Sequence, residues 1–356
     1  MKATHFVARL LLLILAQPLP AADYPAPVDG DYVLRDFQFR SGESLAEVRM
    51  HYRTLGAPQR DEKGVVRNAV LILHGTGGSG TNLLRAEFAG ELFGKGQLLD
   101  ASRYFLILPD NIGHGRSSNP RDGLRAKFPR YGYHDMIEAQ YRLLIEGLRV
   151  NHLRLVMGTS MGGMHTWLWG ETYPEFMDAL MPLASLPAQI SGRNRAWRKM
   201  ILDEIRGDPE WQNGEYQAQP RALRFAVQMV FFMSSNPAQR QKEAPTLQLA
   251  DQLLDSSVAA ALKNWDANDV LYAFDSSRDY DPGPGLEKIR APLIAVNFAD
   301  DLIKQPELGI LEREIKRVKR GKAIVIPQSD DTRGHGTHTL AAIWKQHLAE
   351  LLRDSQ

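Results

Sequence analysis

A five-residue segment, Gly158-Thr159-Ser160-Met161-Gly162, constrains the fold of this 356-residue chain more than any other feature. An apolar run, 153–157, precedes it, and a helix-like run, 161–173, follows it. Glycines on both sides of a serine, between a strand and a helix, permit a tight turn in which the serine hydroxyl stands clear of the sheet. A helix that merely begins with Ser160 as its N-cap explains the same five residues. The remainder of the chain decides between these interpretations.

A serine in such a turn becomes a nucleophile when a histidine takes its proton and a carboxylate holds the imidazole in place. The apolar run 291–298, typical of a buried strand, is followed by Asp300 and Asp301. Because functional groups of parallel sheets gather at the C-terminal ends of strands, an acidic pair there is well placed. We expect Asp300 to be the acid rather than Asp301, for which a solvated loop carboxylate or a helix N-cap is the alternative.

Two histidines, His335 and His338, follow the short predicted strand 323–326 and a polar loop. Glycines flank His335, so the loop can carry its imidazole back toward the serine, and we expect His335 to be the base. The pair could also bind a metal ion. The chain has no Cys, and no third ligand is indicated nearby, so the sequence predicts no metal site.

An attacked carbonyl becomes an oxyanion, which needs backbone N–H donors. In a strand-turn-helix arrangement of this kind, one donor follows the serine and the other lies in the loop after an earlier strand. That strand is 68–73, and the glycine-rich loop 74–80 follows it. The predicted donors are the N–H groups of Thr76 and Met161.

The same loop matches G-x-G-x-x-G at Gly75, Gly77 and Gly80, so a dinucleotide-binding fold is a competing interpretation. Such a fold predicts an acidic residue at the end of a second strand about twenty residues further on. The chain there, 91–95, is helix-like or loop-like. The glycines are better explained as an oxyanion loop.

Apolar runs that alternate with helix-like runs predict a mostly parallel sheet flanked by helices. The expected core strands are 68–73, 104–108, 153–157, 179–184, 293–297 and 323–326. Alternating apolar and polar residues at 48–54 predict antiparallel edge strands. From about 186 to 285 helix-like stretches replace the strand pattern, as in a helical lid inserted before the last strands. The expected divisions are core 23–185, helical lid 186–285 and core 286–356.

The chain resembles the homoserine O-acetyltransferase family of α/β-hydrolase-fold proteins from about Asn68 to its C-terminus. The residues that carry the resemblance are Phe128-Pro129, Asp135-Met136-Ile137, Ala139-Gln140, Ser160-Met161-Gly162-Gly163-Met164, Asp208-Pro209, Trp211, Gly214, Tyr216, Pro220, Ala299-Asp300 and Gly334-His335. The resemblance implies Ser160 as nucleophile, Asp300 as acid and His335 as base. It also implies a helical lid, whose entrance Trp211 and Tyr216 could line, a packing role being the alternative.

Two departures from the family pattern bear on the reaction. The family usually has Asp after the catalytic histidine, where it helps to bind the amino group of homoserine, but this chain has Gly336. The loop that begins His74-Gly75-Thr76 is more similar to the His-Gly oxyanion loop of general esterases. Both departures argue against homoserine as the acceptor.

The N-terminus has the layout of a signal peptide. Lys2 and Arg9 precede or border the apolar run 10–16, which is too short to span a bilayer and is followed by prolines and by Ala21 and Ala22. We expect residues 1–22 to be removed near Ala21 or Ala22 and the protein to be periplasmic or secreted. A retained anchor is the alternative.

The composition excludes some functions. Lys and Arg number 43 and Asp and Glu 42, so the chain lacks the basic excess that binding to nucleic-acid phosphates requires. The absence of Cys excludes disulfides and thiol catalysis. No stretch beyond the leader reaches membrane length.

These observations predict a serine hydrolase that cleaves a carboxylic ester, with an amide as the less favoured alternative, through an acyl-Ser160 intermediate and without a cofactor. Its expected partner is a small-molecule ester or acyl substrate, and a second copy of the chain, in a homodimer, is a further candidate. An exported enzyme meets abundant water and little acyl-CoA, which favours hydrolysis. The alternatives are an acyl-CoA-dependent O-acyltransferase, such as homoserine O-acetyltransferase, and a non-catalytic binding protein on the same fold.

Overall fold

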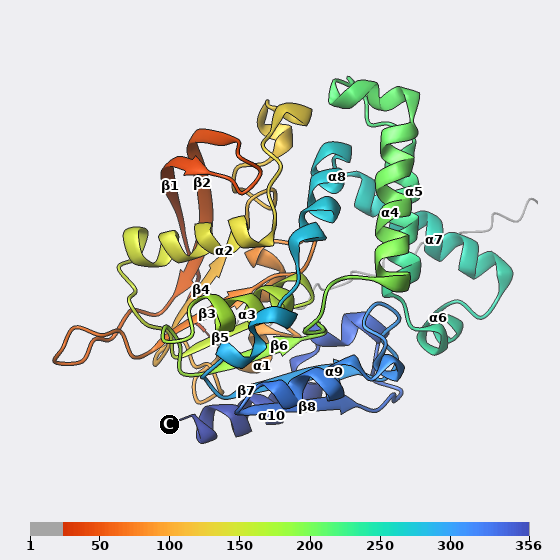
Figure 1. Ribbon diagram of the computed structural model, residues 1–356. Coiled ribbons are helices and arrows are strands. Elements are labelled where there is room, and N and C mark those ends of the chain that lie inside the picture. Colours follow the sequence, from red (N-terminus) through yellow and green to blue (C-terminus); the bar gives the residue numbers. More distant parts are fainter. Residues whose placement is uncertain (1–23, 356) are drawn as a thin grey trace, which may run out of the picture.

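The computed structural model describes residues 24–355, so the expected signal peptide, 1–22, lies outside the described residues. Its centre is an eight-stranded sheet in the order β1-β2-β4-β3-β5-β6-β7-β8 (Figure 1). The strands are β1 (Val28–Gln38), β2 (Ser44–Leu55), β3 (Ala69–Leu73), β4 (Phe105–Pro109), β5 (Leu155–Thr159), β6 (Leu180–Leu183), β7 (Leu293–Phe298) and β8 (Gly321–Ile326). β1 pairs antiparallel with β2, and β2 with β4, whereas all the other neighbours are parallel.

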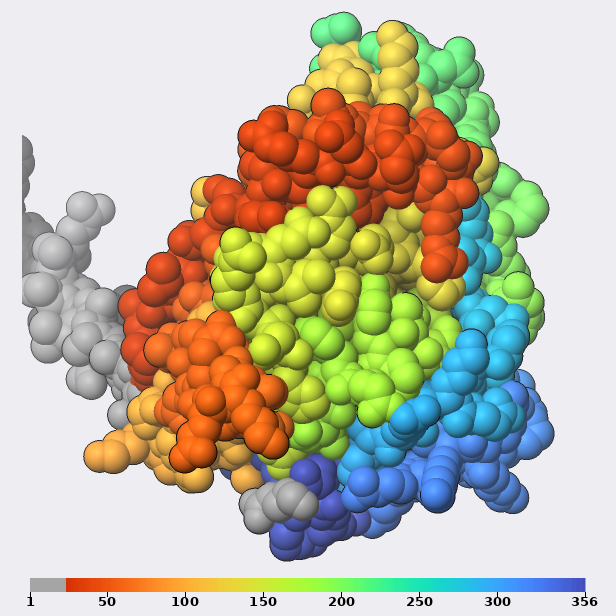
Figure 2. Space-filling model, turned by 60° about the vertical axis from the view of Figure 1, so that its left-hand side comes forward, coloured from red at the N-terminus to blue at the C-terminus, as the bar shows by residue number. Residues whose placement is uncertain are grey.

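Helices cover both faces of the sheet because its central strands are apolar on both sides. Leu71 and Leu73 of β3 belong to the apolar core under α2 (Tyr133–Arg142) and α3 (Met161–Thr172). Val70 and Ile72 face the other way, into the core under α1 (Ala89–Leu92) and α10 (Ala341–Asp354). α9 (Ile310–Glu314) precedes β8. Figure 2 shows the first face, with the hairpin β1–β2 (red) above the helical surface.

Five α-helices lie between β6 and β7 in the chain and form a layer beside the sheet (Figure 1). They are α4 (Gly192–Gly207), α5 (Ala222–Ser234), α6 (Pro237–Glu243), α7 (Leu247–Leu262) and α8 (Ala267–Asp275). α4, α5 and α8 share an apolar cluster of their own, which includes Ile201, Leu223 and Leu271. Within residues 24–355 no helix is both long enough and apolar enough to cross a membrane.

The predicted fold class, a mostly parallel sheet flanked by helices, is confirmed. Each expected core strand begins and ends within two residues of a strand of the structure. The strand expected at 48–54 is β2, which is antiparallel to both its neighbours as predicted. The prediction that it lies at the edge is wrong, because β1 is the edge strand and β2 is paired on both sides. The strand pattern was legible because parallel strands buried on both faces are continuous apolar runs.

Candidate active site

Ser160 lies at the sharp turn between β5 and α3 and has the left-handed backbone angle φ 55°. The flanking glycines have a steric role, since a Cβ on Gly162 would lie 2.1 Å from the carbonyl oxygen of Leu73. A Cβ on Gly158 would lie 2.3 Å from the backbone of Gly162. Ser160 occupies the N-cap position of α3, but its side chain makes no capping hydrogen bond. Its hydroxyl is directed to another partner.

That partner is His335, in the 3-10 turn Gly334–Thr339. Its Nε2 lies 2.8 Å from the Oγ of Ser160, and its Nδ1 lies 2.7 Å from Oδ2 of Asp301. The three side chains come from residues far apart in sequence and form one hydrogen-bonded series. Ser160 and His335 are 8% and 7% exposed, so both open onto a cavity, whereas Asp301 is 2% exposed.

Asp301 is held as an ionised carboxylate. Its Oδ1 accepts hydrogen bonds from the backbone N–H groups of Ile303 (2.7 Å) and Lys304 (3.0 Å), which leaves Oδ2 for the histidine. Burial by itself raises the pKa of this carboxyl, but the adjacent His335 and the two backbone donors outweigh it and lower the pKa. The carboxylate can therefore orient the imidazole and stabilise its protonated form.

The prediction that Asp300 is the partner of the histidine is wrong. Its Oδ2 accepts hydrogen bonds from the Thr332 hydroxyl (2.8 Å) and the Gly334 N–H (2.9 Å), and also from the Asn236 side chain. Asp300 thus ties the histidine loop to the segment that begins α6. Two adjacent residues at the end of a strand point to different sides, and only Asp301 points toward the imidazole.

The predicted oxyanion donors lie next to Ser160. Gly75 approaches the serine so closely that a Cβ on it would be 3.4 Å from the Ser160 Cβ, and Thr76 lines the same cavity. Met161 is the first residue of α3, where a helix has no internal acceptor for its N–H groups. The loop 74–80 leads into a five-residue 3-10 helix, Gly80–Leu84, and not into the long helix of a dinucleotide fold.

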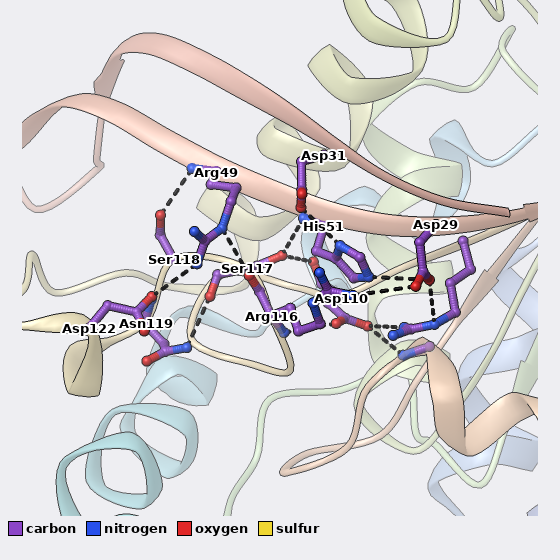
Figure 3. Close-up of polar contacts among 12 residues, drawn as sticks. Asp29, Asp31, Arg49, His51, Asp110, Arg116, Ser117, Ser118, Asn119 and Asp122 are labelled. Atoms are coloured by element: carbon purple, nitrogen blue, oxygen red, sulfur yellow. Dashed lines mark hydrogen bonds and ion pairs between the residues drawn. The ribbon is translucent and has the colours of Figure 1, made fainter.

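A polar cluster around Asp110, which the sequence did not reveal, holds the end of this loop (Figure 3). Asp110, at the end of β4, is fully buried and accepts a hydrogen bond from the Gly80 N–H (2.7 Å). The same oxygen faces Arg53 of β2 at 3.3 Å, and the other oxygen accepts from the Arg116 N–H (2.9 Å). The loop after β4 and the loop after β3 are therefore tied together.

A cavity of about 230 Å³ opens above Ser160 and His335. Trp197, Val230 and Phe274 of the lid supply an apolar wall, and no Asp or Glu lines the cavity. Arg198 of α4 also lines it and is 2% exposed. Its guanidinium donates to the side chains of Asn194 (3.1 Å) and Ser277 (3.3 Å), which are neutral. The cavity therefore contains a buried positive charge with no carboxylate in contact.

Trp211 and Tyr216 do not line this cavity, so of the two roles expected for them the structure has the packing role and not the entrance role. The Trp211 indole donates to the Asn268 side chain (2.8 Å), and the Tyr216 hydroxyl donates to Asp266 (2.8 Å). Both rings belong to the apolar cluster inside the lid. Their polar atoms find partners at the start of α8, which fixes the lid helices to one another.

His338 also lines the cavity, and its ring lies edge-on to that of His335 at 5.2 Å. Burial, with the His335 charge, lowers the pKa of His338 to about 3, so this ring is neutral at neutral pH. Both nitrogens of His335 are occupied by Ser160 and Asp301. Among residues 24–355 no three His, Asp or Glu side chains are grouped as a metal site requires.

Lys304 is a second buried cation, 1% exposed, and the sulfur of Met164 lies 3.4 Å from its Nζ. Burial, with the Arg198 charge, lowers the pKa of Lys304 to about 7, although Asp301 acts in the opposite direction. In the unfolded chain the lysine titrates near its ordinary pKa of about 10.4. Protonation of Lys304 therefore lowers the free energy of unfolding, and this loss of stability is complete below about pH 7. The loss becomes smaller as the pH rises and disappears as the pH approaches 10.

We expect Lys304→Met to be more stable than the native protein by roughly 2 to 4 kcal/mol at pH 6.5, because the variant removes the cost of burying a charge. The advantage should shrink steadily as the pH rises to 9.5. Urea unfolding at both pH values measures it. Lys199→Met is the control, since Lys199 is exposed and paired with Asp203. A stability difference that does not change with pH would contradict the prediction.

The comparisons with known proteins agree with this fold. The family described as alpha/beta hydrolase fold matches residues 68–304. A probable acyltransferase of Methanothermobacter thermautotrophicus is 31% identical over 281 residues, which are 79% of this chain and 85% of that protein. A homoserine O-acetyltransferase of Pelobacter propionicus is 30% identical over 337 residues, 84% of this chain and 89% of that protein. The structure of an acetylester hydrolase from Corynebacterium glutamicum has a TM-score of 0.77 at 20% identity and covers 92% of this chain and 96% of its own.

Proposed function

The chain belongs to the α/β-hydrolase fold family, and on this premise we propose that it hydrolyses a carboxylic ester through an acyl enzyme on Ser160. One observation carries the proposal: the Ser160 hydroxyl, the His335 imidazole and the Asp301 carboxylate are hydrogen-bonded in series at the base of a cavity. This arrangement has the three roles of nucleophile, base and orienting acid in the geometry that nucleophilic catalysis needs.

The reaction follows from these contacts. Nε2 of His335 takes the hydroxyl proton as Oγ of Ser160 attacks the ester carbonyl carbon, and the carbonyl oxygen becomes an oxyanion held by the N–H groups of Thr76 and Met161. The imidazolium, stabilised by Asp301, then gives its proton to the leaving alcohol. Water attacks the acyl-Ser160 carbonyl with His335 again as base, and the carboxylic acid leaves.

The walls of the cavity bear on the substrate. A buried guanidinium without a carboxylate partner is costly, and an anionic ligand group would offset that cost. Arg198 is in this situation, beside an apolar wall formed by Trp197 and Phe274. We infer that the ester has one part that is apolar and another that carries a negative charge.

We expect the native protein to hydrolyse an acetylated hydroxy acid with kcat/KM about 10 to 100 times that for the corresponding neutral methyl ester, since a desolvated charge pair contributes about 1.5 to 3 kcal/mol. Arg198→Met should lose this preference and keep most activity on the neutral substrate. Acetate release measures both. Arg195→Met is the control, because Arg195 lies on the same helix outside the cavity. A preference for the anion that survives in Arg198→Met would refute the inference.

An acyl-CoA-dependent O-acyltransferase is the second candidate, favoured by the homoserine O-acetyltransferase relative of Pelobacter propionicus. Against homoserine stands Gly336, which has no side chain to bind an ammonium group. We also propose that the chain is exported, where water is the abundant acceptor. Acetyl transfer from acetyl-CoA to homoserine, measured against hydrolysis of short-chain p-nitrophenyl esters, separates the two reactions.

A non-catalytic binding protein remains the third candidate. A fluorophosphonate reacts with a serine only where a base and an oxyanion site activate it. We expect the purified protein to be labelled on Ser160 and to hydrolyse p-nitrophenyl acetate. Unlabelled protein without turnover would favour the binding role, and faster transfer to homoserine than to water would favour the acyltransferase.

A further inference from the structure

We propose that a buried series of hydrogen bonds from Trp169 through Gln140, Asn111 and His74 to the carbonyl of Gly75 positions the Thr76 N–H toward the oxyanion. The inference rests on the function proposed above, because it concerns a donor of the same site. It assigns His74, Asn111 and Gln140 as positioning residues, none of which touches the reacting atoms.

The series is continuous. The Trp169 indole N–H donates to Oε1 of Gln140 (2.7 Å), whose Nε2 donates to Oδ1 of Asn111. The Asn111 side-chain nitrogen lies 3.2 Å from Nε2 of His74, and Nδ1 of His74 lies 2.8 Å from the carbonyl oxygen of Gly75. All four side chains are at most 1% exposed, so water does not compete for these contacts.

The direction of every donor in the series is fixed. An indole N–H can only donate, so the Gln140 amide must turn its oxygen to Trp169 and its nitrogen to Asn111. The backbone N–H of Asn111, also only a donor, points to Nε2 of His74 at 3.1 Å. This nitrogen must then be unprotonated, and the proton is on Nδ1, facing Gly75. Burial lowers the pKa of His74, which keeps this neutral form at neutral pH.

The last contact controls the oxyanion donor because the Gly75 carbonyl and the Thr76 N–H belong to one peptide group. That group is planar, so fixing its C=O direction fixes the opposite N–H direction. The Gly75 oxygen accepts a second hydrogen bond, from the Gly78 N–H (3.0 Å), which supports the same orientation. Two donors on the carbonyl also polarise the peptide and strengthen its N–H as a donor.

The series connects the helix that follows the nucleophile with the loop that follows β3. Ser160 immediately precedes α3, and Trp169 lies on that helix, whereas Thr76 follows β3. The series therefore fixes the position of the loop that carries Thr76 relative to α3, the helix that begins directly after Ser160. Gln140 of α2 is the link between them, and its Nε2 also lies 3.2 Å from Nδ1 of the buried His165.

The test compares Gln140→Met with Tyr280→Phe. Gln140→Met removes the hydrogen bonds of Gln140 to Trp169 and Asn111 and replaces the amide by an apolar side chain of similar length. Tyr280→Phe removes another fully buried hydrogen bond, from its hydroxyl to the Leu186 carbonyl (2.7 Å), away from the loop. Activity is divided by the concentration of active sites, titrated with a fluorophosphonate, so that unfolded protein does not count.

We expect Gln140→Met to lower kcat about 10 to 100-fold with KM within about 3-fold, less than the loss of a whole oxyanion donor. The inhibition constant of a trifluoromethyl ketone, which forms a tetrahedral oxyanion on the serine, should rise by a similar factor. Tyr280→Phe should lower the melting temperature and leave kcat unchanged. Trp169→Phe, a milder variant that keeps an aromatic ring, should change kcat in the same direction by about 2 to 10-fold.

Unchanged kcat in both Gln140→Met and Trp169→Phe would overturn the inference, as would an equal fall of kcat in Tyr280→Phe. Failure of the proposed function gives a different result, because Ser160→Ala would then turn over ester as fast as the native protein. Loss of activity in Ser160→Ala, with native kcat in both Gln140→Met and Trp169→Phe, rejects the positioning role alone.

Discussion

Ser160→Ala should lower kcat/KM for p-nitrophenyl acetate by about 10⁴ or more, because the acyl enzyme cannot form without the hydroxyl. The remaining rate should be close to that of direct attack by water on the bound ester, assisted only by the oxyanion donors. The variant should fold normally, since the Ser160 hydroxyl makes a hydrogen bond only to His335 among the described side chains. Initial rates of p-nitrophenol release, with the melting temperature of each protein, measure both expectations.

His335→Ala is the companion variant, and its effect should not add to that of Ser160→Ala in the double variant. Residues that act as one unit show this non-additivity, because the first substitution already abolishes the step in which both residues take part. Losses that multiply would mean that Ser160 and His335 act in separate steps. Unchanged turnover in Ser160→Ala would end the assignment.

Asp301→Asn should lower kcat by about 10⁴, whereas Asp300→Asn should lower it less than about tenfold. An Asn side chain at 301 can turn its N–H₂ group toward Nδ1 of His335, which favours the tautomer with the proton on Nε2. That nitrogen could not take the proton of Ser160. At position 300 an Asn oxygen can still accept from Thr332 and Gly334, so the histidine loop should keep its place.

The two aspartates serve as matched controls for each other, since they are adjacent and the substitution is the same. Esterase assays at pH 8 with both variants decide the question, with circular dichroism to confirm folding. A large loss in Asp300→Asn with near-native activity in Asp301→Asn would restore the assignment that the sequence suggested. Equal small losses would argue against an acid in the mechanism.

The sequence was sufficient for the fold and for two of the three hydrogen-bonded side chains of the candidate site, Ser160 and His335, because their signals are local. Strands buried on both faces are apolar runs. The glycines around Ser160 are required because the backbone packs so closely there that a Cβ would clash. The chain order placed a histidine at 335 after the last strand. The choice between Asp300 and Asp301 needed side-chain directions within one turn, and two adjacent acids at a strand end give no pattern that separates them.

Other features depend on tertiary packing. Arg198 and Lys304 look like ordinary surface residues in sequence, and only the placement of α4 and of the loop after β7 buries them. Trp211 and Tyr216 resembled entrance residues because they lie in the lid, but their polar atoms are used at the start of α8. Asp110 was not singled out in the sequence, and Gln140 only as part of the family resemblance, because each contacts a loop that is distant in sequence.

The central claim is that the acyl group passes through Ser160. Rapid mixing of the native protein with p-nitrophenyl acetate, acid quenching and peptide mass analysis tests it most directly. We predict one added acetyl group on the peptide that contains Ser160, formed faster in Asp300→Asn than in Asp301→Asn and absent in Ser160→Ala. Turnover with no acetylated peptide during the burst, or acetylation of a different residue that persists in Ser160→Ala, would contradict the account.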